Sequence, residues 1–177
     1  MLNPNIWMKR FSVILGSTLI AMMFATGVDA ANPEPVVAEV EFIAPITILE
    51  TNALQYGLLD TNFTGVETIV IAPNDALTDA AGRVLGGTQA AADFTVTATT
   101  AQAITILVDN TSGGVGYTIA SFICNYDAGT DTACDGAGYG ETSVASATLS
   151  IGATITANGS AVPGVDNGSF DVTISYQ

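Results

Sequence analysis

The chain has 177 residues, of which 17 are acidic and three are basic, and it has no histidine, so its formal net charge is −14. This balance excludes nucleic acids and anionic membrane surfaces as partners, because binding to either needs clustered lysine and arginine side chains. Without histidine the usual nucleophile–base catalysis is also missing, and we expect neither an enzyme nor a bound cofactor.

The first 30 residues have the pattern of a signal peptide. Lys9 and Arg10 precede an apolar run over residues 11–24, and Val28 and Ala30 then place small residues at a cleavage site. The run is shorter than the roughly 20 residues that cross a bilayer. We therefore predict cleavage after Ala30, export, and no membrane insertion of the mature chain. An uncleaved membrane anchor is the alternative.

Residues 31–44 are predicted to be a flexible N-terminal extension that contains a candidate donor strand. Two prolines in residues 31–35 favour an extended leader. Apolar side chains then recur at every second position: Val36, Ala38, Val40 and Phe42. Such a strand can add to the sheet of a neighbouring molecule. The alternative is that it forms the first strand of its own sandwich.

The remainder, residues 45–177, is predicted to be an all-β domain, because no segment shows a helical period over three turns. Strands are expected at 46–49, 66–72, 93–99, 103–108, 116–123, 146–156 and 169–177, with a possible bulge at Gly152. Residues 76–91 are expected to form a loop or irregular hairpin, and 109–114 and 158–168 to form turns. The pattern indicates an immunoglobulin-like antiparallel β-sandwich of about seven to nine strands.

The last strand alternates clearly between apolar and polar side chains. Its apolar positions are Phe170, Val172, Ile174 and Tyr176. A strand of this kind must pair within a sheet or leave an apolar edge open to partners. We therefore predict that these four side chains line the groove that accepts a donor strand.

Cys124 and Cys134 are the only two cysteines, and they lie in the exported part of the chain. An oxidising compartment favours a disulfide between them, whereas free thiols or a metal site are the alternatives. Residues 124–142 are rich in glycine and lack periodicity, so we predict a surface loop that the disulfide holds.

Three aspartates in this loop are spaced four residues apart: Asp127, Asp131 and Asp135. Calcium binds flexible, oxygen-rich loops, and these residues are its only candidates here. The spacing and the final glutamate of an EF-hand are missing. A solvated turn without metal is therefore the preferred interpretation.

Several segments in this order resemble the DUF4402 family of exported bacterial proteins. They are residues 42–48, 54–57, 71–73, 92–96, 104–106, 149–154 and 168–176. That family is similar in organisation to the spore-coat-U-like and Mat-type pilins of chaperone–usher systems. The resemblance implies an incomplete sandwich that a neighbour's N-terminal strand completes, with a periplasmic chaperone and an outer-membrane usher as further partners. The chain departs from those pilins in carrying its cysteines in the middle of the sequence.

The expected function is therefore that of a pilin-like structural subunit of an extracellular filament or fimbria, assembled from copies of itself by donor-strand complementation. It would pass through the periplasm in transit to the cell surface. The alternative is a non-polymerising secreted or cell-surface β-sandwich that binds a glycan, a protein or an ion. An N-terminal strand that exchanges between molecules separates the two.

Overall fold

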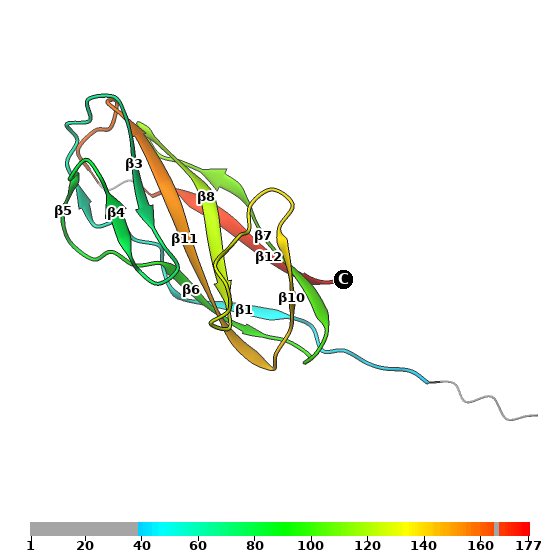
Figure 1. Cartoon of the computed structure of the whole chain (residues 1–177). Coiled ribbons are helices and arrows are strands. Elements are labelled where there is room, and N and C mark those ends of the chain that lie inside the picture. The colour runs from blue at the N-terminus through cyan, green and yellow to red at the C-terminus, as the bar shows by residue number, and fades with distance from the viewer. Residues whose placement is uncertain (1–38, 165–166) are drawn as a thin grey trace, which may run out of the picture. The chain divides into compact units, whose positions relative to one another are not determined.

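Twelve β-strands and no helix make up the part of the chain that the computed structural model describes, residues 39–164 and 167–177. Residues 42–177 form one compact unit (Figure 1). In chain order the strands are β1 (Thr47–Asn52), β2 (Leu58–Leu59), β3 (Val66–Ile71), β4 (Leu77–Asp79), β5 (Val84–Gly86), β6 (Ala92–Thr97), β7 (Ala103–Ser112), β8 (Tyr117–Tyr126), β9 (Thr132–Ala133), β10 (Tyr139–Thr142), β11 (Ser146–Asn158) and β12 (Ser169–Tyr176). The described residues contain no helix of a length and apolarity that would cross a membrane.

The all-β antiparallel sandwich predicted from the sequence is confirmed. The strands β3, β6, β11 and β12 lie where alternation and β-branched residues predicted them. The number exceeds the predicted seven to nine because β2, β4, β5 and β9 are only two or three residues long. The predicted signal peptide, and Val36 and Ala38 of the candidate donor strand, lie outside the described residues.

The larger of the two main sheets is organised around β11. One edge of β11 pairs with β8, and the other pairs with β6 along its first half and with β3 along its second half. Gly152 lies where these two neighbours meet, and the register against β8 shifts between Gly152 and Thr154, which confirms the predicted bulge. A side chain at Gly152 would lie 2.7 Å from the backbone carbon of Ala72, so only glycine fits there.

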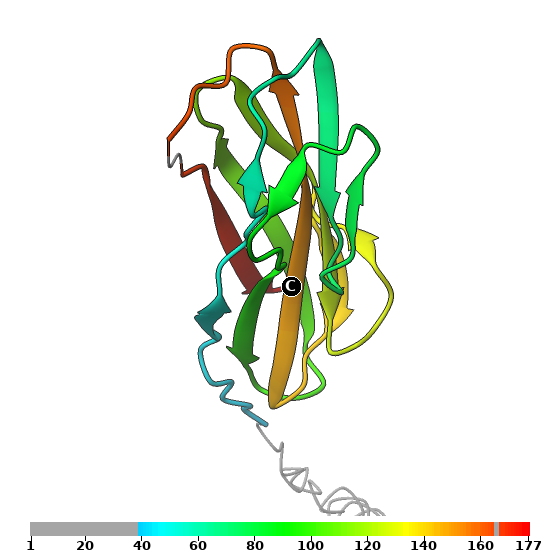
Figure 2. The same cartoon turned by 90° about the vertical axis from the view of Figure 1, so that its left-hand side faces the viewer.

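The smaller sheet has three strands in the order β10–β7–β12 and packs on the larger one. Buried side chains from both sheets form one core, among them Val96, Leu149, Ile104 and Ile106. The ring centroids of Phe122 on β8 and Phe170 on β12 lie 5.0 Å apart across the layers. In Figure 2, β12 (dark red) and β1 (blue) lie along the same border of the sandwich.

The prediction of a turn over residues 109–114 is wrong for its first four residues, because β7 continues to Ser112. Pairing with β12 sets this length: Asp171 faces Asp109, and Ser169 faces Ser112. The register shifts between these two pairs, and Asn110 has a positive φ of 48°. The turn-forming residues are thus accommodated by an irregularity within a paired strand, and tertiary pairing overrides their local preference.

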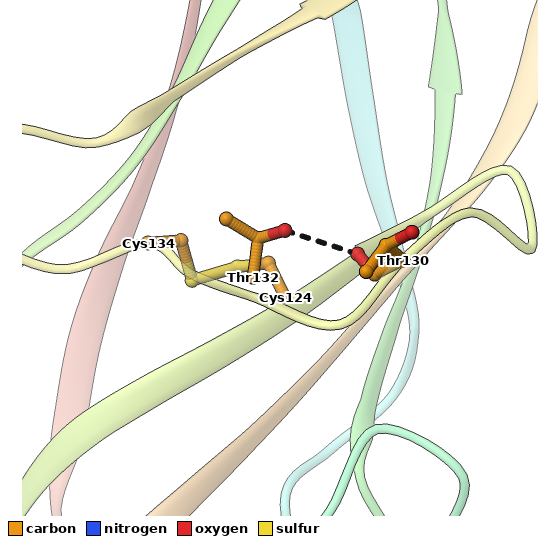
Figure 3. The surroundings of a disulfide bond; sticks show 4 residues. All are labelled: Cys124, Thr130, Thr132 and Cys134. Atoms are coloured by element: carbon orange, nitrogen blue, oxygen red, sulfur yellow. Dashed lines mark hydrogen bonds between the residues drawn. A yellow bond between two sulfur atoms is a disulfide. The ribbon is translucent and has the colours of Figure 1, made fainter.

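The predicted disulfide between Cys124 and Cys134 is confirmed, with 5.8 Å between the Cα atoms (Figure 3). The prediction of a surface loop over residues 124–142 is right for residues 127–131 and 135–137, which are exposed and outside the strands, but wrong for the two cysteines, which are fully buried. Cys124 belongs to β8. The N–H of Cys134 donates to the carbonyl of Phe122 in the larger sheet, and its carbonyl accepts from Val108 in the smaller sheet. The bridge therefore lies inside the sandwich, and residues 139–142 form β10 instead of a loop.

Candidate functional site

The C-terminal strand β12 has an unpaired edge. Within the described part of the chain it pairs only with β7. Its burial alternates as predicted: Phe170, Val172, Ile174 and Tyr176 are half-buried, and the residues between them are exposed. A strand with one free edge and an apolar inner face is a template for a further strand.

A groove of about 1340 Å³ runs beside β12 and under β1. Phe94, Ile119 and Ile155 of the larger sheet line it from below. Phe170 and Val172 line it from the side of β12. The groove exists because three strands cannot cover the inner face of the larger sheet. Its apolar lining and the free edge of β12 together suit an extended chain segment with apolar side chains at alternate positions.

Tyr56 anchors one wall of the groove. Its hydroxyl donates a hydrogen bond of 2.7 Å to the carbonyl oxygen of Ala153 in β11. Burial, and to a smaller degree the neighbouring Tyr117, raise the pKa of Tyr56 above its ordinary value, so the phenol stays neutral. The charged side chains that line the groove are Glu50, Asp60 and Asp171, all acidic.

One end of β12 is fixed by a small hydrogen-bonded cluster, here called the latch: Ala44, Thr99 and Tyr176. The hydroxyl of Tyr176 donates to the carbonyl of Ala44 (2.9 Å) and accepts from the N–H of Thr99 (2.8 Å). The N–H of Ala44 donates to Oγ1 of Thr99 (2.8 Å). The latch therefore fixes the point from which the chain leads into β1 and places it at the C-terminal end of β12.

The four predicted acceptor residues have different surroundings. Phe170 and Val172 line the groove, whereas Ile174 and Tyr176 do not. Ile174 packs against the core, and Tyr176 also belongs to the latch. The groove thus lies beside the first half of β12 and ends before the latch.

The opposite end of the groove is rimmed by exposed apolar side chains, here called the mouth: Leu58, Leu85, Val115 and Val162. Their exposed fractions are 66, 70, 60 and 62 %. They come from β2, from β5, from the β7–β8 connection and from the β11–β12 connection, and all four line the groove. Exposed apolar side chains gathered around one opening mark an interaction surface.

Arg83 holds the side of the mouth that β2 and β5 form. Its guanidinium makes two hydrogen bonds to the carboxylate of Glu67, one of them Nη2–Oε1 at 2.7 Å, and Nη1 lies 3.7 Å from Oδ2 of Asp60. The hydrogen bonds from Arg83 are the main reason that the pKa of Glu67 is lowered to about 2. Both carboxylates are thereby tied to one cation, which fixes the segment between β2 and β3.

The candidate donor residues that fall within the described chain, Val40 and Phe42, are exposed and belong to no strand. Phe42 is 91 % exposed. Val36 and Ala38 lie outside the described residues.

The three aspartates considered for calcium, Asp127, Asp131 and Asp135, are all exposed. Oδ1 of Asp131 accepts a hydrogen bond from the side-chain amide of Asn125 (2.7 Å). Across residues 39–164 and 167–177, no three histidine, cysteine or acidic side chains gather as metal ligands would.

Reasoning from the sequence missed the groove floor and the mouth. Phe94 and Ile119 were recognisable as inward-facing positions of predicted strands, yet nothing in their spacing shows that they lack a covering strand. Leu58 and Leu85 lie in two-residue and three-residue strands whose periodicity is too short to detect. The one available signal was that these large apolar residues lie next to glycines, as Leu58 follows Gly57 and Leu85 precedes Gly86.

Comparison with protein families finds a match to the family described as "Domain of unknown function (DUF4402)" over residues 46–176. Comparison with curated proteins and with solved structures gives no match. The matched segment begins just before β1 and ends with β12, so it contains every strand of the sandwich and the whole groove. The chain therefore belongs to the DUF4402 family.

Proposed function

We propose that the chain is a pilin-like structural subunit of an extracellular filament, in which residues 36–43 of one copy fill the groove of the next. One observation carries the proposal: β12 has a free edge directly beside an apolar groove that no described segment fills. A strand added to β12 would give the smaller sheet a fourth strand and cover the exposed part of the larger one.

The candidate donor segment has the side-chain pattern that the groove needs. Val36, Ala38, Val40 and Phe42 point to one side of an extended strand, and Glu39 and Glu41 point to the other. Burial of Val36, Val40 and Phe42 would contribute roughly 5–8 kcal/mol. Main-chain hydrogen bonds to β12 would fix the register.

The latch favours a donor from another copy. Because the latch fixes Ala44 at the C-terminal end of β12, a molecule's own residues 36–43 would have to reverse direction there and lie parallel to β12. A segment from another copy is free to lie antiparallel, which is the more stable pairing per residue. A contact in which each copy gives a strand and receives one does not close on itself and generates a fibre.

The remaining features agree with a structural subunit that is exported. The predicted signal peptide and the buried disulfide suit an oxidising compartment. An export chaperone would cover the free edge of β12 before assembly, and an usher would exchange it for the donor strand. We propose no catalytic role for the groove, whose lining contains no histidine, lysine or cysteine.

The first test is electron microscopy of the purified mature chain, residues 31–177. We expect filaments from the unchanged chain and none from Val40→Asp, which would place a charge in the groove. The matched control is Val37→Asp, which adds the same charge on the outward face and should preserve filaments. A chain that stays monomeric with its own extension paired to β12 would instead support the secreted binding module.

The second test adds a synthetic peptide of residues 31–43 to a chain that begins at Ala44. The peptide should raise the melting temperature of the shortened chain, and the Val40→Asp peptide should not. If the shortened chain forms the same filaments without any peptide, the donor-strand proposal is wrong.

A further inference from the structure

The mouth is exposed although it is strongly apolar, and the filament proposal does not by itself explain it. Its four side chains come from four separate segments and converge on one end of the groove. The Arg83 contacts to Asp60 and Glu67 hold two of these segments in place. An apolar rim that the fold keeps ordered while exposed is expected to meet a partner.

The groove reaches the mouth at one end and stops short of the latch at the other, because none of Ala44, Thr99 and Tyr176 lines it. A donor strand pairs more stably with β12 in the antiparallel direction than in the parallel one, so we place its last residues at the mouth. Because β12 begins at the mouth and ends at the latch, such a donor runs antiparallel to β12.

The position of Phe42 then follows from the length of the chain. Phe42 is the last of the alternating apolar residues, so it is the donor residue nearest the mouth. It lies two positions before Ala44, which corresponds to about 7 Å of extended chain. Since the latch of the donor copy holds Ala44, the body of that copy must lie directly against the mouth of the acceptor.

We propose that Leu58, Leu85, Val115 and Val162 form the seat for Phe42 of a second copy of this chain. The inference rests on the proposed function and adds to it the place on the acceptor where the last apolar side chain of the donor strand is buried. Phe42 is 91 % exposed in its own subunit, and among residues 39–164 and 167–177 it is the one large aromatic side chain so exposed. The seat sets the spacing between successive subunits of the filament.

Disulfide trapping between two differently substituted mature chains tests the seat. The chain has two cysteines and they are bonded to each other, so it offers no other thiol. Chains carrying Phe42→Cys are mixed with chains carrying Leu58→Cys, Leu85→Cys or Val162→Cys, assembled, and oxidised gently. We expect a covalent dimer on a non-reducing gel with at least one of the three.

The matched control is Leu49→Cys on β1, because Leu49 is 67 % exposed but does not line the groove. It should give at least tenfold less dimer than the best mouth position. A second measurement is the critical concentration for assembly, which should rise at least tenfold in the double variant Leu58→Ser and Leu85→Ser and stay unchanged in Leu49→Ser.

The results separate the two proposals. The first outcome is that filaments form and depend on Val40, while Phe42→Cys forms no disulfide with any mouth position and the double variant assembles normally. That result would refute the proposed seat for Phe42 and leave the donor-strand proposal intact. If Val40→Asp has no effect on assembly, or if the mature chain never assembles, the donor strand is wrong and the seat falls with it.

Discussion

Ser143 is the one polar side chain that lies fully buried among the described residues, with 1 % of its surface exposed. It fixes the turn between β6 and β7. Its Oγ accepts from the N–H of Gln102 (3.0 Å) and donates to the carbonyl of Thr99 or of Gln102. Its backbone adds two more hydrogen bonds, to Ala101 and to Gln102, each of 2.8 Å. The same turn carries Thr99 of the latch.

Ser143→Ala removes the hydroxyl and leaves the backbone contacts in place. The hydroxyl makes one hydrogen bond as an acceptor and one as a donor, and each contributes about 0.5–1.5 kcal/mol to the net stability. The expected loss in the free energy of unfolding is therefore about 1–3 kcal/mol. With a urea m-value of about 2 kcal/mol/M, the unfolding midpoint should fall by roughly 0.5–1.5 M.

The assay is urea unfolding of the mature chain followed by far-ultraviolet circular dichroism. All chains carry Val40→Asp, so that assembly does not contribute to stability. The control is Ser146→Ala, at an exposed serine three residues further on, which should change stability by less than about 0.5 kcal/mol. A Ser143→Ala midpoint equal to that of the control would refute the assignment of Ser143 as the anchor of this turn.

Three further outcomes are expected. Gly152→Ala should destabilise the fold by at least about 1–3 kcal/mol in the same urea assay, because its methyl group would meet the backbone of Ala72 and Pro73, whereas Gly65→Ala, in open space, should not. Removing the disulfide by Cys124→Ala with Cys134→Ala should lower stability by about 3 kcal/mol, measured against the oxidised parent. The pKa of Glu67 is lowered from 4.5 to about 2 in the folded chain. The ionised Glu67 side chain therefore stabilises the fold above pH 4.5, and this stabilisation is lost as the pH falls towards 2. The melting temperature of Glu67→Gln should accordingly be lower at neutral pH and fall less between pH 5 and pH 2 than that of the parent, and equal slopes would contradict the assigned pairing.

The sequence predicted those strands whose two faces differ in polarity. Phe170, Val172, Ile174 and Tyr176 alternate without interruption, so period two identified both the strand and its inner face. The bulge at Gly152 was predictable because a glycine within a β-branched run is unfavourable unless another backbone approaches closely.

Features that depend on contacts between distant segments were not predictable. The polar residues after Asp109 suggest a turn, and only their pairing with β12 keeps them in β7. The glycines and aspartates around Cys134 suggest an exposed loop, and nothing local shows that Cys134 itself is buried and hydrogen-bonded to both sheets. The groove forms because the three-stranded sheet is narrower than the larger sheet that it covers. No local sequence pattern indicates the relative widths of two sheets.

The pairing of Arg83 with Glu67 has a consequence for resistance to proteolysis. Proteases of the trypsin type cut after lysine or arginine, and beyond residue 30 the sequence contains no lysine and Arg83 as its one arginine. The side chain of Arg83 is 16 % exposed and held by two carboxylates, so it cannot enter a protease specificity pocket while the fold is intact. Cleavage at this bond requires local unfolding first. The folded chain beyond residue 30 should therefore resist proteases of the trypsin type.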